Sequence, residues 1–206
     1  MIHINNILKN YVDFSIKVDD FKFENNSLIC ITGSNGSGKT TLLKILTSLT
    51  SFKGSVYIDN ININKSDNWK ELIATHIDDN YLLDFLNKNE FIDFFCNSYG
   101  IDFKVELRNN FFLKSLYESI PSNKLIREYS KGNKAKIGIL SVLLSGVKHM
   151  IFDEPFANLD IETQKKLASY LNELKNHKTI ILTTHHKEVI SNCCDTFIHI
   201  TNGQIK

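Results

Sequence analysis

The stretch Gly33-Ser-Asn-Gly-Ser-Gly-Lys-Thr40 decides the fold of this 206-residue chain. It follows the continuous apolar run Leu28–Thr32, which predicts a strand buried on both faces, and it precedes a helical run from Thr41 to Leu49. Glycines permit positive φ and close backbone approach, so successive N–H groups can point at one anion, and the following helix adds its positive N-terminal end. We therefore expect the loop to cradle the phosphates of ATP.

Two positions of this loop have defined chemical roles. Lys39 is expected to reach the β- and γ-phosphates, and the Thr40 hydroxyl is expected to bind Mg²⁺. The alternative, a glycine-rich turn without a ligand, is disfavoured by the flanking strand and helix. The other loop positions predicted to contact the nucleotide are Ser34, Asn35, Gly36, Ser37, Gly38 and Thr41.

A second candidate site lies at the end of the apolar run Met150-Ile-Phe-Asp-Glu154. Its two acids would stand at the carboxyl edge of the sheet, beside the phosphates. Asp153 is expected to hold Mg²⁺ through water, and Glu154 is expected to polarise the attacking water. An acid pair after a strand is usually only a solvated strand end, and the phosphate loop makes the catalytic interpretation the stronger one.

The remaining patterns predict an α/β fold. Buried strands are expected at Met150–Phe152 and Thr179–Leu182, with an amphipathic helix between them, which favours a mostly parallel sheet. Alternation over Val12–Val18 predicts an N-terminal antiparallel β-subdomain, and Asn202-Gly203 predicts a hairpin.

We expect one domain, 1–206, with a P-loop NTPase core and an all-helical lobe inserted at about 79–145. Within it, an aromatic helical face and a second, less regular apolar helix are expected to pack. The first comprises Phe91, Phe94, Phe95 and Tyr99, and the second Leu107, Phe111, Phe112, Leu116 and Ile120.

Composition excludes several classes of function. The net charge of +1 indicates no nucleic-acid partner. The four cysteines lack zinc-site spacing and are expected to be free thiols in a reducing, cytosolic compartment. The longest apolar stretch, Ile137–Val147, is shorter than the about 20 residues that cross a bilayer.

Four further motifs give a family resemblance. They are Tyr129-Ser-Lys-Gly-Asn133, Asp153-Glu-Pro-Phe156, Ala157-Asn-Leu-Asp160 and Thr184-His185. In this order, after the phosphate loop, they resemble the signature, Walker B, D-loop and switch motifs of the nucleotide-binding subunit of ABC transporters, over nearly the whole chain.

The resemblance implies roles for particular residues. Ser130, a good helix N-cap, would with Gly132 and Asn133 contact the γ-phosphate held by a second protomer, so that two ATPs lie between domains arranged head to tail. The pair would be a homodimer or this chain with another ATPase domain. His185 would sense the γ-phosphate, with His186 the less favoured alternative.

Two residues, Tyr11 and Asp78, match the family pattern less closely. Tyr11 lies where the family stacks an aromatic on adenine, with Phe14 as the substitute. Asp78 stands where the family has the Q-loop glutamine, which binds Mg²⁺ and links the site to the membrane partner. Aspartate is a good ligand for Mg²⁺, but its shorter reach puts the coupling in question.

The leading hypothesis is an ATPase subunit that powers a separate transmembrane permease from the cytoplasmic face of the cell membrane. The Tyr-Ser-Lys-Gly and Asp-Glu-Pro-Phe forms resemble exporter subunits, including those that export haem for cytochrome c maturation, peptides or drugs. The runner-up is a soluble ABC-type ATPase, such as an iron–sulfur assembly factor. A GTPase or small-molecule kinase is disfavoured because the chain has no Asn-Lys-x-Asp run and such enzymes lack the signature.

Overall fold

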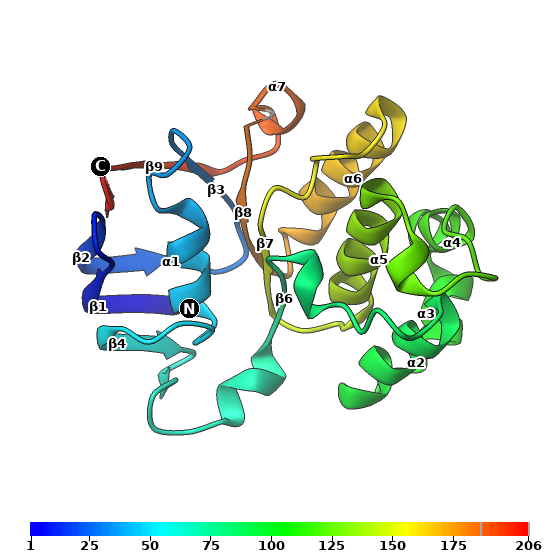
Figure 1. Ribbon diagram of the computed structural model, residues 1–206, viewed down its shortest axis with the longest axis horizontal. Helices are drawn as coiled ribbons and strands as arrows, with labels where there is room; N and C mark the ends of the chain where they lie inside the picture. Colours follow the sequence, from blue (N-terminus) through cyan, green and yellow to red (C-terminus); the bar gives the residue numbers. More distant parts are fainter. Residues whose placement is uncertain (186, 206) are drawn as a thin grey trace.

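The computed structural model describes residues 1–185 and 187–205, with a six-stranded sheet at its centre (Figure 1). The strand order is β10-β9-β3-β8-β7-β6, and every neighbouring pair is parallel except β10 with β9. This confirms the predicted mostly parallel sheet. Its strands are β3 (Leu28–Thr32), β6 (Ile73–His76), β7 (His149–Phe152), β8 (Thr179–Thr183), β9 (Thr196–Thr201) and β10 (Gln204–Ile205).

The central strands β3, β7 and β8 are buried over their whole length because both faces of the sheet are covered. Successive side chains of a strand point to opposite faces. Ile29 and Ile31 of β3 therefore join the core formed with α1 (Lys39–Leu46), whereas Leu28 and Cys30 join the core formed with the helices on the other face. The phosphate loop therefore connects two well-packed elements, β3 and α1.

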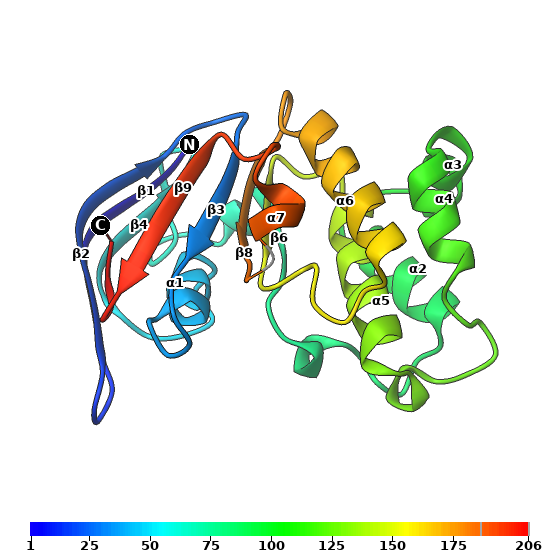
Figure 2. The same cartoon turned by 90° about the horizontal axis from the view of Figure 1, so that it is seen from above.

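A second, antiparallel sheet of order β2-β1-β4-β5 covers α1 (Figure 2). Its strands are β1 (Ile2–Asn10), β2 (Ser15–Phe23), β4 (Lys53–Ile58) and β5 (Ile61–Asn62). The sequence patterns did not predict β1, and the predicted strand at 12–18 begins only at Ser15 and runs on to Phe23. Pairing with β1 sets these bounds, since Asn10 lies opposite Ser15 and Ile2 opposite Phe23.

Helices gather at the end of the molecule opposite to the antiparallel sheet (Figures 1 and 2). The helical lobe consists of α2 (Lys88–Ser98), α3 (Phe103–Asn109), α4 (Phe111–Glu118) and α5 (Lys131–Leu144). The other helices are α6 (Ile161–Leu174), the short α7 (Lys187–Ile190) and the 3₁₀ turns η1 (Asn68–Leu72), η2 (Asp79–Tyr81) and η3 (Ile126–Glu128).

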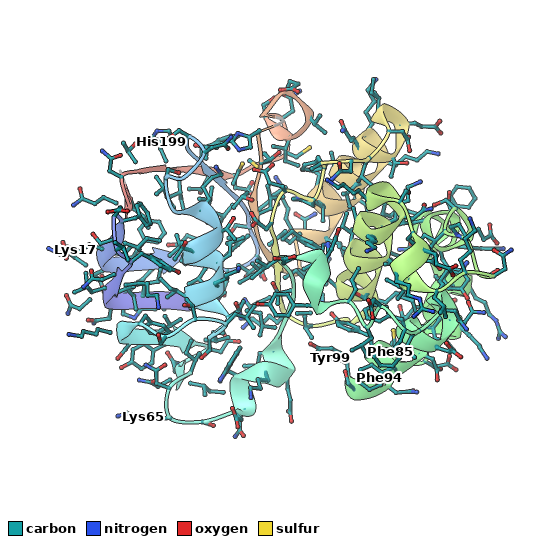
Figure 3. The ribbon with its side chains drawn as sticks, in the orientation of Figure 1. Lys17, Lys65, Phe85, Phe94, Tyr99 and His199 are labelled. Carbon is teal, nitrogen blue, oxygen red and sulfur yellow. The ribbon has the colours of Figure 1, made fainter. Side chains whose placement is uncertain are left out.

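Two details of the predicted helical packing are wrong. Phe94 is 60% exposed and Phe111 is 85% exposed, so neither belongs to the core, and Figure 3 shows Phe94 at the lower edge of the molecule. The second expected helix is in fact two, because Asn110 ends α3 and its side chain caps α4 by accepting the Leu113 N–H. The helix after the phosphate loop also ends early, at Leu46.

The predicted hairpin at Asn202-Gly203 is confirmed, with positive φ at both residues. The Gly203 N–H donates to the Ser37 carbonyl, and the Gly203 carbonyl accepts from the Lys17 N–H. A Cβ on Gly203 would lie 1.8 Å from the Ser15 carbonyl oxygen, so only glycine fits. The hairpin is thus hydrogen-bonded to the phosphate loop at Ser37.

Two further expectations concern thiols and membranes. All four cysteines are free thiols, as predicted. Within residues 1–185 and 187–205, we find no helix with the length and apolar character needed to span a membrane.

Candidate nucleotide site

The phosphate loop takes the backbone form that its glycines permit. Gly33, Gly36 and Gly38 have φ of 156°, 77° and 110°. Gly38 is the N-cap residue of α1 and has no side chain to occupy the first N–H groups of the helix. A Cβ on Gly36 would meet no atom within 4 Å. Free helix-end donors and open space in front of them are what an anionic phosphate requires.

Lys39 links the loop to the opposite side of the site. Its Nζ donates to the carbonyls of Gly33 (3.0 Å) and Ser34 (3.2 Å) and lies 3.3 Å from Nε2 of His185. The same ring nitrogen lies 3.3 Å from Oε1 of Glu154. The backbone N–H of His185 donates to Oε2 of Glu154 at 3.0 Å. The histidine therefore stands between the cationic and anionic groups of the site.

Asp153 and Thr40 form the candidate metal site. The Thr40 hydroxyl donates to Oδ2 of Asp153 at 2.5 Å, across two elements that are 113 residues apart in sequence. Hydroxyl and carboxylate oxygens are the hard donors that Mg²⁺ prefers, and Mg²⁺ keeps several waters in such sites. The donor set fits Mg²⁺.

Glu154 holds a strained backbone conformation at the end of β7. Its φ is 49°, a left-handed value that costs a residue with a side chain on the order of 1–3 kcal/mol. The Glu154 N–H donates to Oγ1 of Thr183 at 2.9 Å, and the Thr183 hydroxyl donates to Asp153. Thr183 is fully buried, and the sequence analysis did not predict it as a site residue. Its position could have indicated a role, because it is a polar residue at the end of β8, the strand that pairs with β7.

These groups line one cavity of about 500 Å³, a size typical of small-molecule sites. Tyr11 and Phe14 are among its lining residues, joined by a hydrogen bond from the Tyr11 N–H to the Phe14 carbonyl. Tyr11 is 48% exposed, and the Lys9 Nζ lies 5.1 Å from the centroid of its ring. The cavity is lined by Tyr11, Phe14, Asn35, Gly36, Gly38, Lys39, Thr40, Thr41, Asp153, Glu154 and His185.

Some predicted residues lie elsewhere. Ser34 is exposed and contributes a carbonyl to Lys39. Ser37 is buried, and a Cβ on Gly33 would lie 2.5 Å from its Oγ, so its side chain packs under the loop. Asp78 lines a different hollow, described below. His186 lies outside the described residues.

The predicted signature residues stand at the start of α5. Ser130 is the N-cap, and its Oγ accepts the Asn133 N–H at 3.3 Å. A Cβ on Gly132 would lie 2.7 Å from the carbonyl oxygen of Asn158, so this turn of α5 packs directly on the backbone that precedes α6. None of the three residues is among the described lining of the nucleotide cavity.

The comparisons with known proteins agree with this geometry. A model of the ABC transporter family matches residues 16–157. ABC transporter A family member 11 of Dictyostelium discoideum is 30% identical and aligns with 98% of this chain, which spans only 24% of that protein. The energy-coupling factor transporter ATP-binding protein EcfA1 of Thermotoga maritima is also 30% identical, over 94% of this chain and 75% of that protein.

A solved structure shows the same fold. It is the dimeric post-hydrolysis state of the ATP-binding cassette MJ0796 bound to ADP and Pi, which superposes with a TM-score of 0.84 at 23% identity, over all of this chain and 97% of that one. At this identity the likeness establishes the fold alone. The family model and EcfA1 establish more, and the chain belongs to the ABC transporter family as one of its ATP-binding ATPase domains.

Proposed function

We propose that this chain hydrolyses ATP with Mg²⁺ and drives a separate transmembrane permease. The observation that carries the proposal is the single cavity that joins Lys39 and Thr40 of the phosphate loop to Asp153, Glu154 and His185. These residues follow the three neighbouring strands β3, β8 and β7, and they are the types needed to hold a triphosphate and activate a water.

Each side chain has a proposed task. Lys39 turns from the loop carbonyls to the β- and γ-phosphates. Glu154 accepts hydrogen bonds from the attacking water and aligns it, while His185 donates to the γ-phosphate. Mg²⁺ is held by Thr40 and Asp153, together with Asp78 from the segment that follows β6. When bound, the ion would neutralise charge on the phosphate oxygens. Tyr11 stacks on adenine.

A second protomer completes the site in this proposal. Ser130, Gly132 and Asn133 begin a 14-residue helix whose N-terminal end is suited to an anion. They lie in the helical lobe and outside the described lining of their own chain's cavity. A head-to-tail pair, with a second copy or another ATPase domain, would bring them to the partner's γ-phosphate.

A groove beside Asp78 supports the permease partner. It measures about 290 Å³ and lies between the end of α1, β6, α2 and α5. Tyr81 and Phe94 in its lining are 54% and 60% exposed, a high value for large aromatics. Its described lining is mostly apolar and includes no lysine or arginine, which suits an apolar cytoplasmic segment of the permease. The proposed location of the chain is therefore the cytoplasmic face of the membrane.

Export is the proposed direction, on the resemblance of the Tyr129-Ser-Lys-Gly form to exporter subunits. The competing function is a soluble ABC-type ATPase such as an iron–sulfur assembly factor. Affinity purification from solubilised membranes separates the two. Recovery of a membrane permease supports transport, whereas recovery of a soluble scaffold alone contradicts it.

The catalytic assignment is tested with Glu154→Gln. The amide keeps the shape of the side chain but cannot act as the carboxylate, so we expect kcat for ATP hydrolysis to fall by about 10²–10⁴ while ATP binding is retained. Gel filtration of the same variant with saturating ATP should show a dimer. Glu162→Gln, at an exposed position on α6, is the matched control and should keep full turnover.

Undiminished turnover in Glu154→Gln would refute the role of this acid. Strictly monomeric elution at high protein concentration and saturating ATP would count against the composite site.

A further inference from the structure

His76 packs its ring directly on the backbone of α5. A Cβ added to Gly138 would lie 2.2, 2.3 and 2.6 Å from Cε1, Nδ1 and Nε2 of the imidazole. Gly138 is buried in the middle of α5, where alanine would favour the helix over glycine. Its φ is not among the positive values of the chain, so the backbone conformation does not demand glycine. The glycine makes room for the histidine ring.

The backbone of the same histidine holds the candidate metal ligand. The His76 carbonyl accepts the N–H of Asp153 at 2.9 Å, at the end of the parallel pairing of β6 with β7. The ring is only 11% exposed, with Nε2 3.5 Å from a carboxylate oxygen of Asp79 in η2. Asp78 follows two residues later along the chain. His76 therefore contacts the helical lobe with its ring and the nucleotide site with its backbone.

The contact is well placed to transmit movement. Gly138 lies six residues after Gly132 on the same helix, which is about 9 Å along a rigid axis. A shift of the signature end of α5 would therefore reach the imidazole. His76 also lines the groove beside Asp78, but on its α5 side the ring lies against the helix backbone at Gly138, where little free volume is left to absorb such a displacement.

We propose that His76 is a positioning residue that couples the placement of α5 to the placement of Asp153 and of the Asp78 segment. The inference rests on the proposed metal role of Asp153. When α5 moves toward β6, the ring is pressed, and the His76 carbonyl carries the displacement to the Asp153 amide. Occupation of the signature end by phosphate would thereby adjust the metal ligands of the chain's own site.

The test is a double-mutant cycle of Gly138→Ala and His76→Ala. Gly138→Ala alone should raise the Mg²⁺ concentration for half-maximal ATPase activity about fivefold or more, because the methyl group displaces the ring. Backbone hydrogen exchange at Asp153 should become faster. Nucleotide binding without Mg²⁺ should stay within about twofold of the parent, because the phosphate loop is untouched.

In the His76→Ala background the same alanine should have less than about a twofold effect on both readouts, since the ring it would strike is gone. This rescue separates positioning from simple damage to the fold. The inference is overturned if Gly138→Ala matches the parent in both readouts, or if its defect persists in the double variant. Absence of ATPase activity from the parent would contradict the proposed function, and hydrogen exchange at Asp153 would still decide the inference.

Discussion

At the scale of single residues, Thr183 organises both acids of the site with one hydroxyl group. It donates to Asp153 and accepts the N–H of Glu154. The second bond holds Glu154 in its left-handed conformation, which would otherwise relax. The positions of the two carboxylates thus depend on a residue that does not line the described cavity.

Thr183→Val keeps the side-chain volume and removes these two bonds. One of them is the bond to the Asp153 carboxylate, and a bond to a charged group contributes about 1.5–3 kcal/mol, so we expect kcat to fall by about 10–100-fold. The measurement is steady-state ATPase activity beside thermal unfolding. Thr179→Val is the matched control, because Thr179 is equally buried at the other end of β8 and accepts the Asn26 N–H. Equal kcat in the two variants would contradict the role of Thr183.

At the scale of elements, α5 and the turn before α6 form one unit. Gly132 packs on the Asn158 carbonyl, and Lys136 of α5 lies 3.8 Å from a carboxylate oxygen of Asp160. Asp160 is also the N-cap of α6, where its Oδ1 accepts the Thr163 N–H at 2.9 Å. The predicted signature and D-loop motifs are therefore held in fixed relative positions.

Gly132→Ala should separate these elements. The methyl group would press on a backbone oxygen that has no rotamer to change, and overpacking of this kind costs about 1–3 kcal/mol. We expect a lower free energy of unfolding in urea and a lower ATPase rate. Lys134→Ala in the same turn of α5 should change the free energy of unfolding by less than about 0.5 kcal/mol. A Gly132→Ala variant as stable and active as the parent would refute this packing argument.

At the scale of the whole molecule, the two sheets meet at a buried histidine. His149 begins β7 in the central sheet and is fully buried, and its Nε2 lies 3.3 Å from a carboxylate oxygen of Asp59 in the β4–β5 turn. Burial lowers the pKa of His149 from 6.5 to about 4, and the Asp59 carboxylate opposes this shift only in part. The folded protein thus keeps the imidazole neutral.

A pKa lowered in the folded state makes acid destabilising. Between pH 6.5 and pH 4 the unfolded chain binds a proton that the folded chain does not, so the free energy of unfolding should fall by about 2–3 kcal/mol through this one group. His149→Leu should flatten that part of the curve, measured by urea unfolding at several pH values. An unchanged slope in the variant would contradict the assignment.

Local patterns identified much of the fold and the candidate site. The loop from Gly33 to Thr40, the run that ends in Asp153 and the hairpin at Asn202-Gly203 were all readable, because their chemistry lies in consecutive residues. The unexpected exposure of two aromatic side chains has one cause. Phe94 and Phe111 fit an apolar helical pattern, but whether a face is covered depends on elements that are distant in sequence.

The sequence by itself determined that a triphosphate loop joins a buried strand to a helix, since glycine freedom and helix-end charge are local properties. Only the tertiary structure decided which side chains meet across strands. It brought the Thr40 hydroxyl to Asp153, placed Thr183 behind Glu154 and seated His76 on Gly138. These contacts depend on the order and register of parallel strands, which long-range pairing sets and no short stretch of residues records.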